Sequence, residues 1–295
     1  MSRHRRVVAL LICAVLAGVL AVKLNRSDEP SYGGRDLSEW VMRFHWDQPE
    51  KTRLEAGEAI RQIGTNAIPS LFEAIQYEAP PWKKKLRRWI SRFSGGSANS
   101  ERWMSWPEQR ADMAKGAFVH LGPAAESAIP ELVGLLNDPQ RSYTASRASS
   151  VLGFIGKPAL EPLINVATTG AIPARCLALR SLGGLNSNAV PAIALLIERL
   201  GDSNATVAAS AAIALGQIKS EPARVVPALT TAFGDPRPWV SSFSARALVD
   251  FGRDARSAVP VLVEALSATN ADTRNIATNT LRYIAPEVLT NAPPR

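Results

Sequence analysis

The chain has few of the residues on which disulfides and metal sites depend. Two cysteines and three histidines occur in 295 residues, and one of the cysteines, Cys13, lies in an apolar N-terminal run. Two cysteines cannot build a disulfide framework. His4, His45 and His120 are too widely spaced for a conventional zinc site. The sequence therefore predicts no metal and no cofactor.

Motifs that mark common enzymes are also absent. The chain has no Gly-x-Ser-x-Gly elbow, no Walker phosphate loop, no Gly-x-Gly-x-x-Gly turn opening a helix and no EF-hand loop. These absences favour a non-catalytic binding module over an enzyme. No segment shows the two-residue alternation of a β-strand, whereas 46% hydrophobic content is ample for a buried core. We therefore expect an all-α fold.

Positive charge is concentrated in two places. Of a net charge of +8, residues 1–26 carry +5 and residues 82–93 carry +6, so the remaining residues sum to −3. A repeat protein that binds nucleic acid needs a basic stripe along its repeats to neutralise phosphates. The charge distribution therefore argues against nucleic acid as the partner.

The N-terminal segment combines positive charge with an apolar run. Arg3, Arg5 and Arg6 precede Val7–Val22, which has no charged side chain. As a helix at about 1.5 Å per residue this run measures about 24 Å, against about 30 Å for the hydrocarbon core of a bilayer. The layout is typical of an uncleaved signal anchor or a cleaved signal peptide over residues 1–24, and both readings stay open. With the positive charge inside, the rest of the chain is expected outside the cytoplasm, membrane-anchored or secreted.

From residue 53 onward the chain repeats itself. Apolar segments end in glycine, at intervals of 58, 34, 27, 33 and 36 residues, and a proline opens the next apolar segment. The glycines are Gly64, Gly122, Gly156, Gly183, Gly216 and Gly252, and the prolines are Pro69, Pro130, Pro162, Pro191, Pro227 and Pro260. Glycine accepts the left-handed conformation that closes a helix, and proline suits the first turn of the next one. The pattern predicts stacked helix pairs, such as 191–200 followed by Ala205–Ile218.

These features resemble the HEAT-repeat family of α-solenoids. The resemblance rests on the proline-opened first helices, on turn aspartates at Asp138, Asp202 and Asp235, and on the Ala-Leu-Gly ending at residues 214–216. It covers about residues 51–285, and a period near 33 residues is typical of such repeats. HEAT repeats often carry a basic residue in the second helix that pairs with the turn aspartate. Arg147 and Arg246 match that position, whereas Ala205–Ile218 contains no basic residue.

The segment before the repeats predicts a capping helix. Leu37, Trp40, Val41 and Phe44 fall on one helical face, and a cover for the first repeat is expected because terminal repeats otherwise expose their apolar side. The predicted organisation is a signal segment (1–24), a linker (25–34), the capping helix (35–50), the solenoid (51–285) with an insertion at about 76–108, and a tail (286–295).

Two resemblances within HEAT-like proteins imply enzymes, and we weigh both. Dinuclear-iron hydroxylases of this architecture carry His-Glu pairs, and this chain has no His-Glu dipeptide. Bilin lyases share the short repeat, which would make Cys176 a candidate nucleophile. Its neighbours are packing residues of a predicted helix, where a free cysteine usually serves as a small buried apolar residue.

The insertion between Ile75 and Gln109 is the irregular part of the repeat pattern. It holds four of the seven tryptophans and the whole second basic cluster. Residues 82–93 predict an amphipathic helix with Trp82, Leu86, Trp89, Ile90 and Phe93 on one stripe. The candidate binding residues are Trp82, Lys83, Lys84, Lys85, Arg87, Arg88, Trp89, Arg92 and Phe93. Such a helix suits an anionic lipid surface or polymer, and the alternative is that its apolar stripe packs on the neighbouring repeat.

The sequence thus predicts an α-solenoid of HEAT-like helix pairs preceded by an apolar anchor helix. The predicted function is a membrane-tethered scaffold that binds protein or peptide partners outside the cytoplasm. A bilin-lyase-like enzyme using Cys176 and a binder of anionic polymer or lipid through residues 82–93 are the alternatives.

Overall fold

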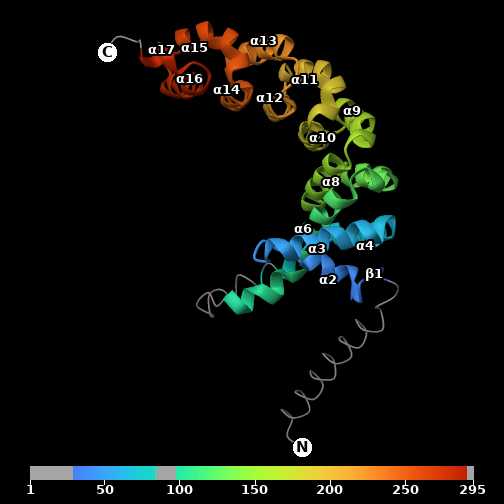
Figure 1. The fold of residues 1–295 in the computed structure, drawn as a ribbon. Coiled ribbons are helices and arrows are strands. Elements are labelled where there is room, and N and C mark those ends of the chain that lie inside the picture. The colour runs from blue at the N-terminus through green and yellow to red at the C-terminus, as the bar shows by residue number, and fades with distance from the viewer. Residues whose placement is uncertain (1–28, 84, 86–97, 291–295) are drawn as a thin grey trace, which may run out of the picture.

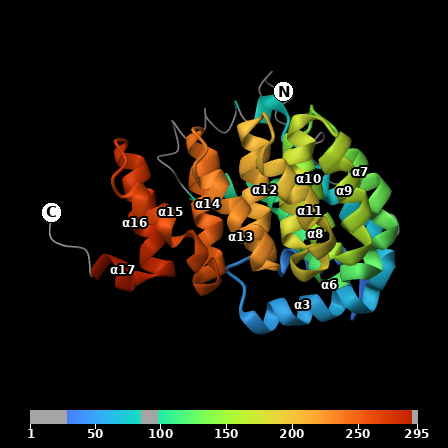
Figure 2. The ribbon, with the colours of Figure 1, turned by 90° about the horizontal axis from the view of Figure 1, so that it is seen from above.

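Stacked helices form an open arc in the computed structural model, which describes residues 29–83, 85 and 98–290 (Figure 1). Helices α2 and α3 lie at one end of the arc, and α16 and α17 lie at the other. Successive helices stand side by side when the arc is viewed from above (Figure 2). This architecture confirms the predicted all-α solenoid. Within the described residues no helix is both long and apolar enough to cross a membrane. The predicted anchor, residues 7–22, lies outside them.

The helices that form the stack come in pairs, with short 3-10 turns before several of the first helices. The elements are β1 (Ser31–Tyr32), β2 (Arg35–Asp36), α2 (Leu37–Met42), α3 (Glu50–Ile63), η1 (Gly64–Ala67), α4 (Ile68–Ile75), α6 (Ala98–Leu121), η2 (Gly122–Ala128), α7 (Ile129–Leu136), α8 (Ser142–Ile155), η3 (Lys157–Ala159), α9 (Leu160–Thr169), α10 (Ile172–Gly184), η4 (Asn186–Ala192), α11 (Ile193–Leu200), α12 (Ala205–Ile218), α13 (Pro222–Phe233), α14 (Pro238–Phe251), η5 (Gly252–Ala258), α15 (Val259–Ala265), α16 (Ala271–Ile284) and α17 (Pro286–Thr290).

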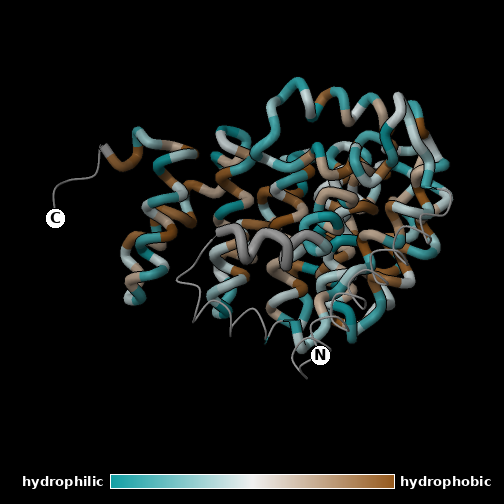
Figure 3. The backbone as a smooth tube through the Cα atoms, turned by 90° about the horizontal axis from the view of Figure 1, so that it is seen from below, coloured by the Kyte–Doolittle hydropathy of each residue, from teal (hydrophilic) through white to brown (hydrophobic). Residues whose placement is uncertain are grey.

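The second helices of the pairs line the inside of the arc, and the first helices line its outside. Figure 1 shows α8, α10, α12, α14 and α16 on the inner side of the arc, and α9, α11, α13 and α15 on its outer side. The inner helices pack directly on one another from α6 to α16. Apolar positions recur along every layer of the stack rather than gathering in one centre (Figure 3). The arrangement is the one expected of a solenoid, in which each unit buries its apolar face against its neighbours.

The N-terminal end of the stack is covered by α2. Leu37, Trp40 and Val41 are buried there, and α2 contacts both α3 and α6. The indole Nε1 of Trp40 donates a hydrogen bond to the carbonyl oxygen of Tyr32, at 3.0 Å. Tyr32 belongs to a two-residue antiparallel hairpin in which Ser31 pairs with Asp36. The sequence did not predict this hairpin, because a strand of two residues is too short to show alternation.

Two of the six glycines do not close helices as the sequence predicted. Gly64, Gly122, Gly156 and Gly252 have positive φ and stand at helix ends, as expected. Gly183 and Gly216 lie inside α10 and α12, in contact with the next inner helix. A β-carbon at Gly183 would lie 2.9 Å from the Cα of Ala214. Glycine is required at both positions for the close approach of two helices. In α12 the residue with the left-handed conformation is Lys219, at the end of the helix.

The C-terminal half differs from the sequence prediction in two further places. Helix α13 begins at Pro222 rather than at Pro227, which lies inside the helix. Proline at the first helical position leaves no amide unsatisfied, so Pro222 suits the start. Residues 286–290, predicted as part of the tail, form helix α17 and pack against α16.

Candidate functional site

The predicted binding residues of the insertion fall mostly outside the described residues. Lys84, Arg87, Arg88, Trp89, Arg92 and Phe93 lie outside them. Of the three that are described, Trp82 is 63% exposed and Lys85 is also exposed, whereas Lys83 is half-buried. The amphipathic helix over 82–93 therefore stays a prediction. Residues 98–108, at the C-terminal end of the predicted insertion, belong to α6.

Lys83 is held by internal contacts. Its Nζ donates to the hydroxyl of Tyr77 and to the carboxylate of Glu108, both at 3.1 Å, and lies 5.3 Å from the centre of the Tyr77 ring. Burial opposes the charge, but the hydrogen bonds to Tyr77 and Glu108 raise the pKa of Lys83 overall. Lys83 thus links Tyr77, just after α4, to Glu108 of α6.

Cys176 lacks the surroundings of an activated nucleophile. It is half-buried on α10, and this burial raises the pKa of its thiol, with only partial opposition from Ser210 and Arg175. A reactive cysteine needs a lowered pKa in an electropositive, accessible setting. The depression beside it is lined mainly by apolar atoms of α8, α10 and the turn after α7. The geometry gives no support to a bilin-lyase-like role.

His120 packs between the first two layers of the stack. Its ring stacks on Phe44 with centroids 5.0 Å apart and covers Gly57, where a β-carbon would come within 2.6 Å of the ring. Burial, followed by the charge of Arg61, lowers the pKa of His120. Within the described residues, no group of three or more histidine, cysteine or acidic side chains is placed to hold a metal ion.

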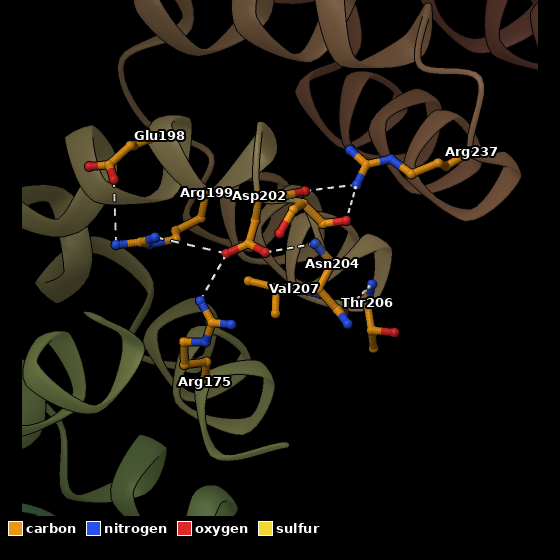
Figure 4. A network of polar contacts seen from close by, with 9 residues as sticks. Arg175, Glu198, Arg199, Asp202, Asn204, Thr206, Val207 and Arg237 are labelled. Carbon is orange, nitrogen blue, oxygen red and sulfur yellow. Dashed lines mark hydrogen bonds and ion pairs between the residues drawn. The ribbon is translucent and has the colours of Figure 1, made fainter. Parts of the chain in front are cut away.

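Asp202, in the turn after α11, joins three consecutive units (Figure 4). Its Oδ2 accepts a hydrogen bond from Arg175 of α10 at 3.0 Å and lies 3.8 Å from an Nη1 of Arg199 in α11. Its Oδ1 accepts the backbone N–H of Asn204 at 2.8 Å. The Asp202 side chain is only 6% exposed, so these partners compensate a carboxylate that has lost most of its hydration.

The next unit is attached to the same turn. Arg237, just before α14, donates to the carbonyl oxygens of Asp202 and Ser203, at 2.7 and 3.1 Å. Asn204 caps α12 by accepting the backbone N–H groups of Thr206 and Val207. The turn therefore fixes α10, α12 and α14 relative to one another at one edge of the inner surface.

The two arginines proposed as partners of turn aspartates do not fill that role. Arg147 donates to Asp112 of α6 at 2.9 Å and to the carbonyl oxygen of Tyr77 at 2.7 Å. Arg246 pairs with Asp250 of its own helix, at 3.5 Å. Arginines in the first turn of the second helix, or just before it, reach the neighbouring turn instead, as Arg175 and Arg237 do. Arg147, in the middle of α8, also reaches the chain at the end of α4, but there it contacts the carbonyl oxygens of Ile75 and Tyr77 and no aspartate.

The inner surface of α12, α14 and α16 carries two adjoining depressions. The first lies between α12 and α14, with a volume of about 520 Å³, and the second between α14 and α16, with about 320 Å³. Both volumes fall in the range of ligand pockets, but both depressions are broad and open to solvent. Arg246 lines both of them.

Two exposed aromatic side chains lie in or next to these depressions. Trp239 of α14 is 69% exposed and Tyr283 of α16 is 70% exposed. The Trp239 ring stacks on Phe243, with centroids 6.0 Å apart. Large apolar side chains exposed side by side with a cation are typical of binding surfaces. We name the surface formed by Trp239, Phe243, Arg246, Asp250 and Tyr283, with the lining residues of the two depressions, the inner aromatic surface.

Sequence reasoning missed the inner aromatic surface, although a signal was present. Trp239, Phe243, Arg246 and Asp250 stand at offsets of 0, 4, 7 and 11, which places them on one face of a helix. The corresponding positions of α12 hold Thr206, Ser210, Ile213 and Gln217. The large aromatic side chains at these positions of α14, where α12 has smaller ones, are therefore the sequence signal for this surface.

A family model matches part of the chain. Residues 193–282 match the family model of HEAT repeats, which confirms the resemblance inferred from the sequence. No curated protein matches the sequence.

Among solved structures, an engineered protein of the Northeast Structural Genomics Consortium is 20% identical, with a TM-score of 0.43, over 85% of this chain and 99% of that one. A second engineered protein is 18% identical, with a TM-score of 0.44, over 85% of this chain and 97% of that one. Kap121p bound to the extreme C-terminus of the protein phosphatase Cdc14p is 16% identical, with a TM-score of 0.49, over 84% of this chain and 32% of that one. This chain thus corresponds to about a third of the length of Kap121p.

Proposed function

We propose that this HEAT-repeat chain is a non-catalytic scaffold that binds a protein or peptide partner on the inner aromatic surface. The observation that carries the proposal is the placement of Trp239 and Tyr283, which each expose more than two thirds of their surface. Trp239 lies two turns before Arg246 on α14, and Tyr283 lines the second depression together with Arg246. Aromatic and arginine side chains dominate the energy of protein interfaces. No packing requirement of the stack accounts for their exposure.

The position of these residues on the inside of the arc supports the proposal. A partner in the arc contacts several units at once, and the turn at Asp202 holds α10, α12 and α14 in fixed relation (Figure 4). A surface that is rigid before binding loses little conformational entropy on binding. The scaffold therefore presents its binding groups already in place.

We further propose that the scaffold is tethered to a membrane, with the repeats outside the cytoplasm. The support comes from the sequence of residues 1–26, in which Arg3, Arg5 and Arg6 precede the apolar run Val7–Val22. Residues 82–93 are a second proposed contact with lipid or with an anionic polymer, from their arrangement of basic and aromatic residues.

The binding proposal is tested by capturing partners from native membranes with paired variants of the full-length chain. Trp239→Ser with Tyr283→Ser removes the exposed aromatics of the inner surface. The matched control, Val261→Ser with Val263→Ser, changes two side chains of α15, each 40% exposed. We expect the inner variant to lose specific partners that the wild type and the control retain. Equal capture by all three proteins would contradict the proposed site.

A further inference from the structure

We propose that the inner aromatic surface binds an extended peptide segment with one central acidic residue, whose carboxylate is held by Arg246, and with apolar residues on both sides. The inference rests on the proposed function, because it specifies the partner chemistry of the same surface. It is carried by the position of Arg246, by the charges around it and by the spacing of the helices.

Arg246 stands at the centre of the surface. It is the one side chain that lines both depressions, and it follows Phe243 by three residues, so both lie on the same face of α14. Its side chain is 74% exposed, in contrast to those of Arg175 and Arg199, which are 20% and 17% exposed in the Asp202 turn. Arg246 is thus presented to solvent inside the arc.

The contacts of Arg246 leave most of its hydrogen-bonding capacity available. Its Nε lies 3.5 Å from Asp250 in an exposed i,i+4 pair, and pairs of this kind contribute little. A guanidinium has five N–H donors in a planar fork that matches a carboxylate. A partner carboxylate is therefore the group that complements Arg246 best.

The neighbouring charges favour a single acid over an acidic run. Lys219 is the second cation of the first depression, and Asp250 is its one carboxylate. Among the described residues, Arg246 is the one charged side chain that lines the second depression. Asp250 repels a second acidic residue placed beside it. One carboxylate bound at Arg246 therefore matches the charges that line the two depressions.

Apolar side chains flank the cation on both sides. Ile213 and Phe243 line the first depression, and Ile276 and Tyr283 line the second. Packed helices lie about 8–10 Å apart, and an extended chain advances about 3.3 Å per residue. A segment that crosses from α12 to α16 therefore needs about six residues, with apolar side chains about three positions before and after the acid.

The test selects random twelve-residue peptides, displayed on phage, with the purified full-length protein. Peptides kept by the wild type but lost by Arg246→Gln are sequenced and remade with the acidic residue changed to Gln or Lys. Arg224→Gln is the matched control, because Arg224 is also exposed, on α13, and pairs with Glu221 within its own unit. Arg246→Glu tests charge reversal, and circular dichroism checks that every variant is folded.

We expect Asp or Glu to be enriched among the peptides that depend on Arg246. Such peptides should bind Arg246→Gln about tenfold more weakly, the loss expected for one charge-assisted hydrogen bond, and bind Arg224→Gln as the wild type does. The Lys-substituted peptides should prefer Arg246→Glu. Absence of acidic enrichment overturns the inference, as does binding that does not change with Arg246.

Other outcomes separate this inference from the proposed function. If partner capture depends on Trp239 and Tyr283 while selected peptides show no acidic preference, the binding surface stands and the acidic-peptide inference fails. If soluble polygalacturonate binds in an Arg246-dependent manner and no peptide is selected, the surface binds an anionic polymer, and both the inference and the protein-binding proposal are wrong.

Discussion

Gly216 of α12 lies so close to Ala247 of α14 that a β-carbon at residue 216 would stand 3.0 Å from both the Cα and the Cβ of Ala247. The inner helices therefore approach one another along a small-residue contact at this level of the stack. The contact sets the separation of the helices that border the first depression of the inner aromatic surface.

Gly216→Ala is expected to destabilise the protein, because the added methyl group forces α12 and α14 apart. Overpacking of this kind costs about 1–3 kcal/mol. Gly134→Ala is the matched control: Gly134 lies inside α7, and a β-carbon there would meet nothing within 4 Å. Alanine in an exposed helix interior is favoured over glycine by about 0.5–1 kcal/mol. Urea unfolding followed by circular dichroism should show opposite signs for the two changes, and equal effects would contradict the close packing.

Asp202→Asn is expected to destabilise the stack by leaving Arg175 without a compensating charge and Arg199 with only its pair to the exposed Glu198, at 3.4 Å. Removing one partner of a buried ion pair costs about 3–5 kcal/mol, and the partial exposure of both arginines puts the expected loss at the lower end. Arg256→Ala, which breaks the exposed pair with Glu287, should change the free energy of unfolding by less than about 1 kcal/mol. Similar losses in the two variants would show that the Asp202 turn does not hold the units together.

His120 is expected to make stability depend on pH. Because burial and Arg61 lower its pKa in the folded state, the unfolded chain, with a histidine pKa of about 6.5, takes up the proton first as the pH falls. The stability present above pH 6.5 is then lost progressively as the pH falls through the folded-state pKa. Urea midpoints between pH 7.5 and 5.5 should fall in the wild type and fall less in His120→Gln. Equal slopes in the two proteins would exclude His120 as the cause.

A reporter that is active only outside the cytoplasm, fused after Arg295, is expected to be functional. The reason is the cluster of Arg3, Arg5 and Arg6 ahead of the apolar run Val7–Val22. The same reporter placed after Arg6, in place of the rest of the chain, should be inactive, because it lacks the apolar run. A C-terminal fusion that is active only in the cytoplasm would reverse the proposed location.

The repeat architecture was predictable from sequence because its signals are local. Apolar spacing of 3.6 residues, prolines at first helices and a period near 33 residues do not depend on tertiary contacts. The roles of Gly183 and Gly216 were not predictable in this way, since a glycine that closes a helix and one that admits a neighbouring helix look the same in one sequence. The contacts of Asp202 reach from α10 to α14, so only the stacked structure brings them together.

The binding surface was missed for a related reason. Residues 82–93 were predicted as the binding residues because their composition departs from that of the repeats. Trp239 and Phe243, in contrast, lie in a helix of the same length as α12. Their exposure follows from the side of the helix that faces the inside of the arc. That side is fixed by the packing of α14 between α12 and α16.

Site-specific photo-crosslinking tests the central claim, that partners bind inside the arc, most directly. A photoreactive amino acid replaces Gln217, which lines the first depression on α12, or Thr231, which is exposed on the outer helix α13. Irradiation in cells that express the full-length chain should give discrete adducts with other proteins from position 217 and none from position 231. Adducts from position 231 alone, or equal adducts from both positions, would contradict binding on the inner surface.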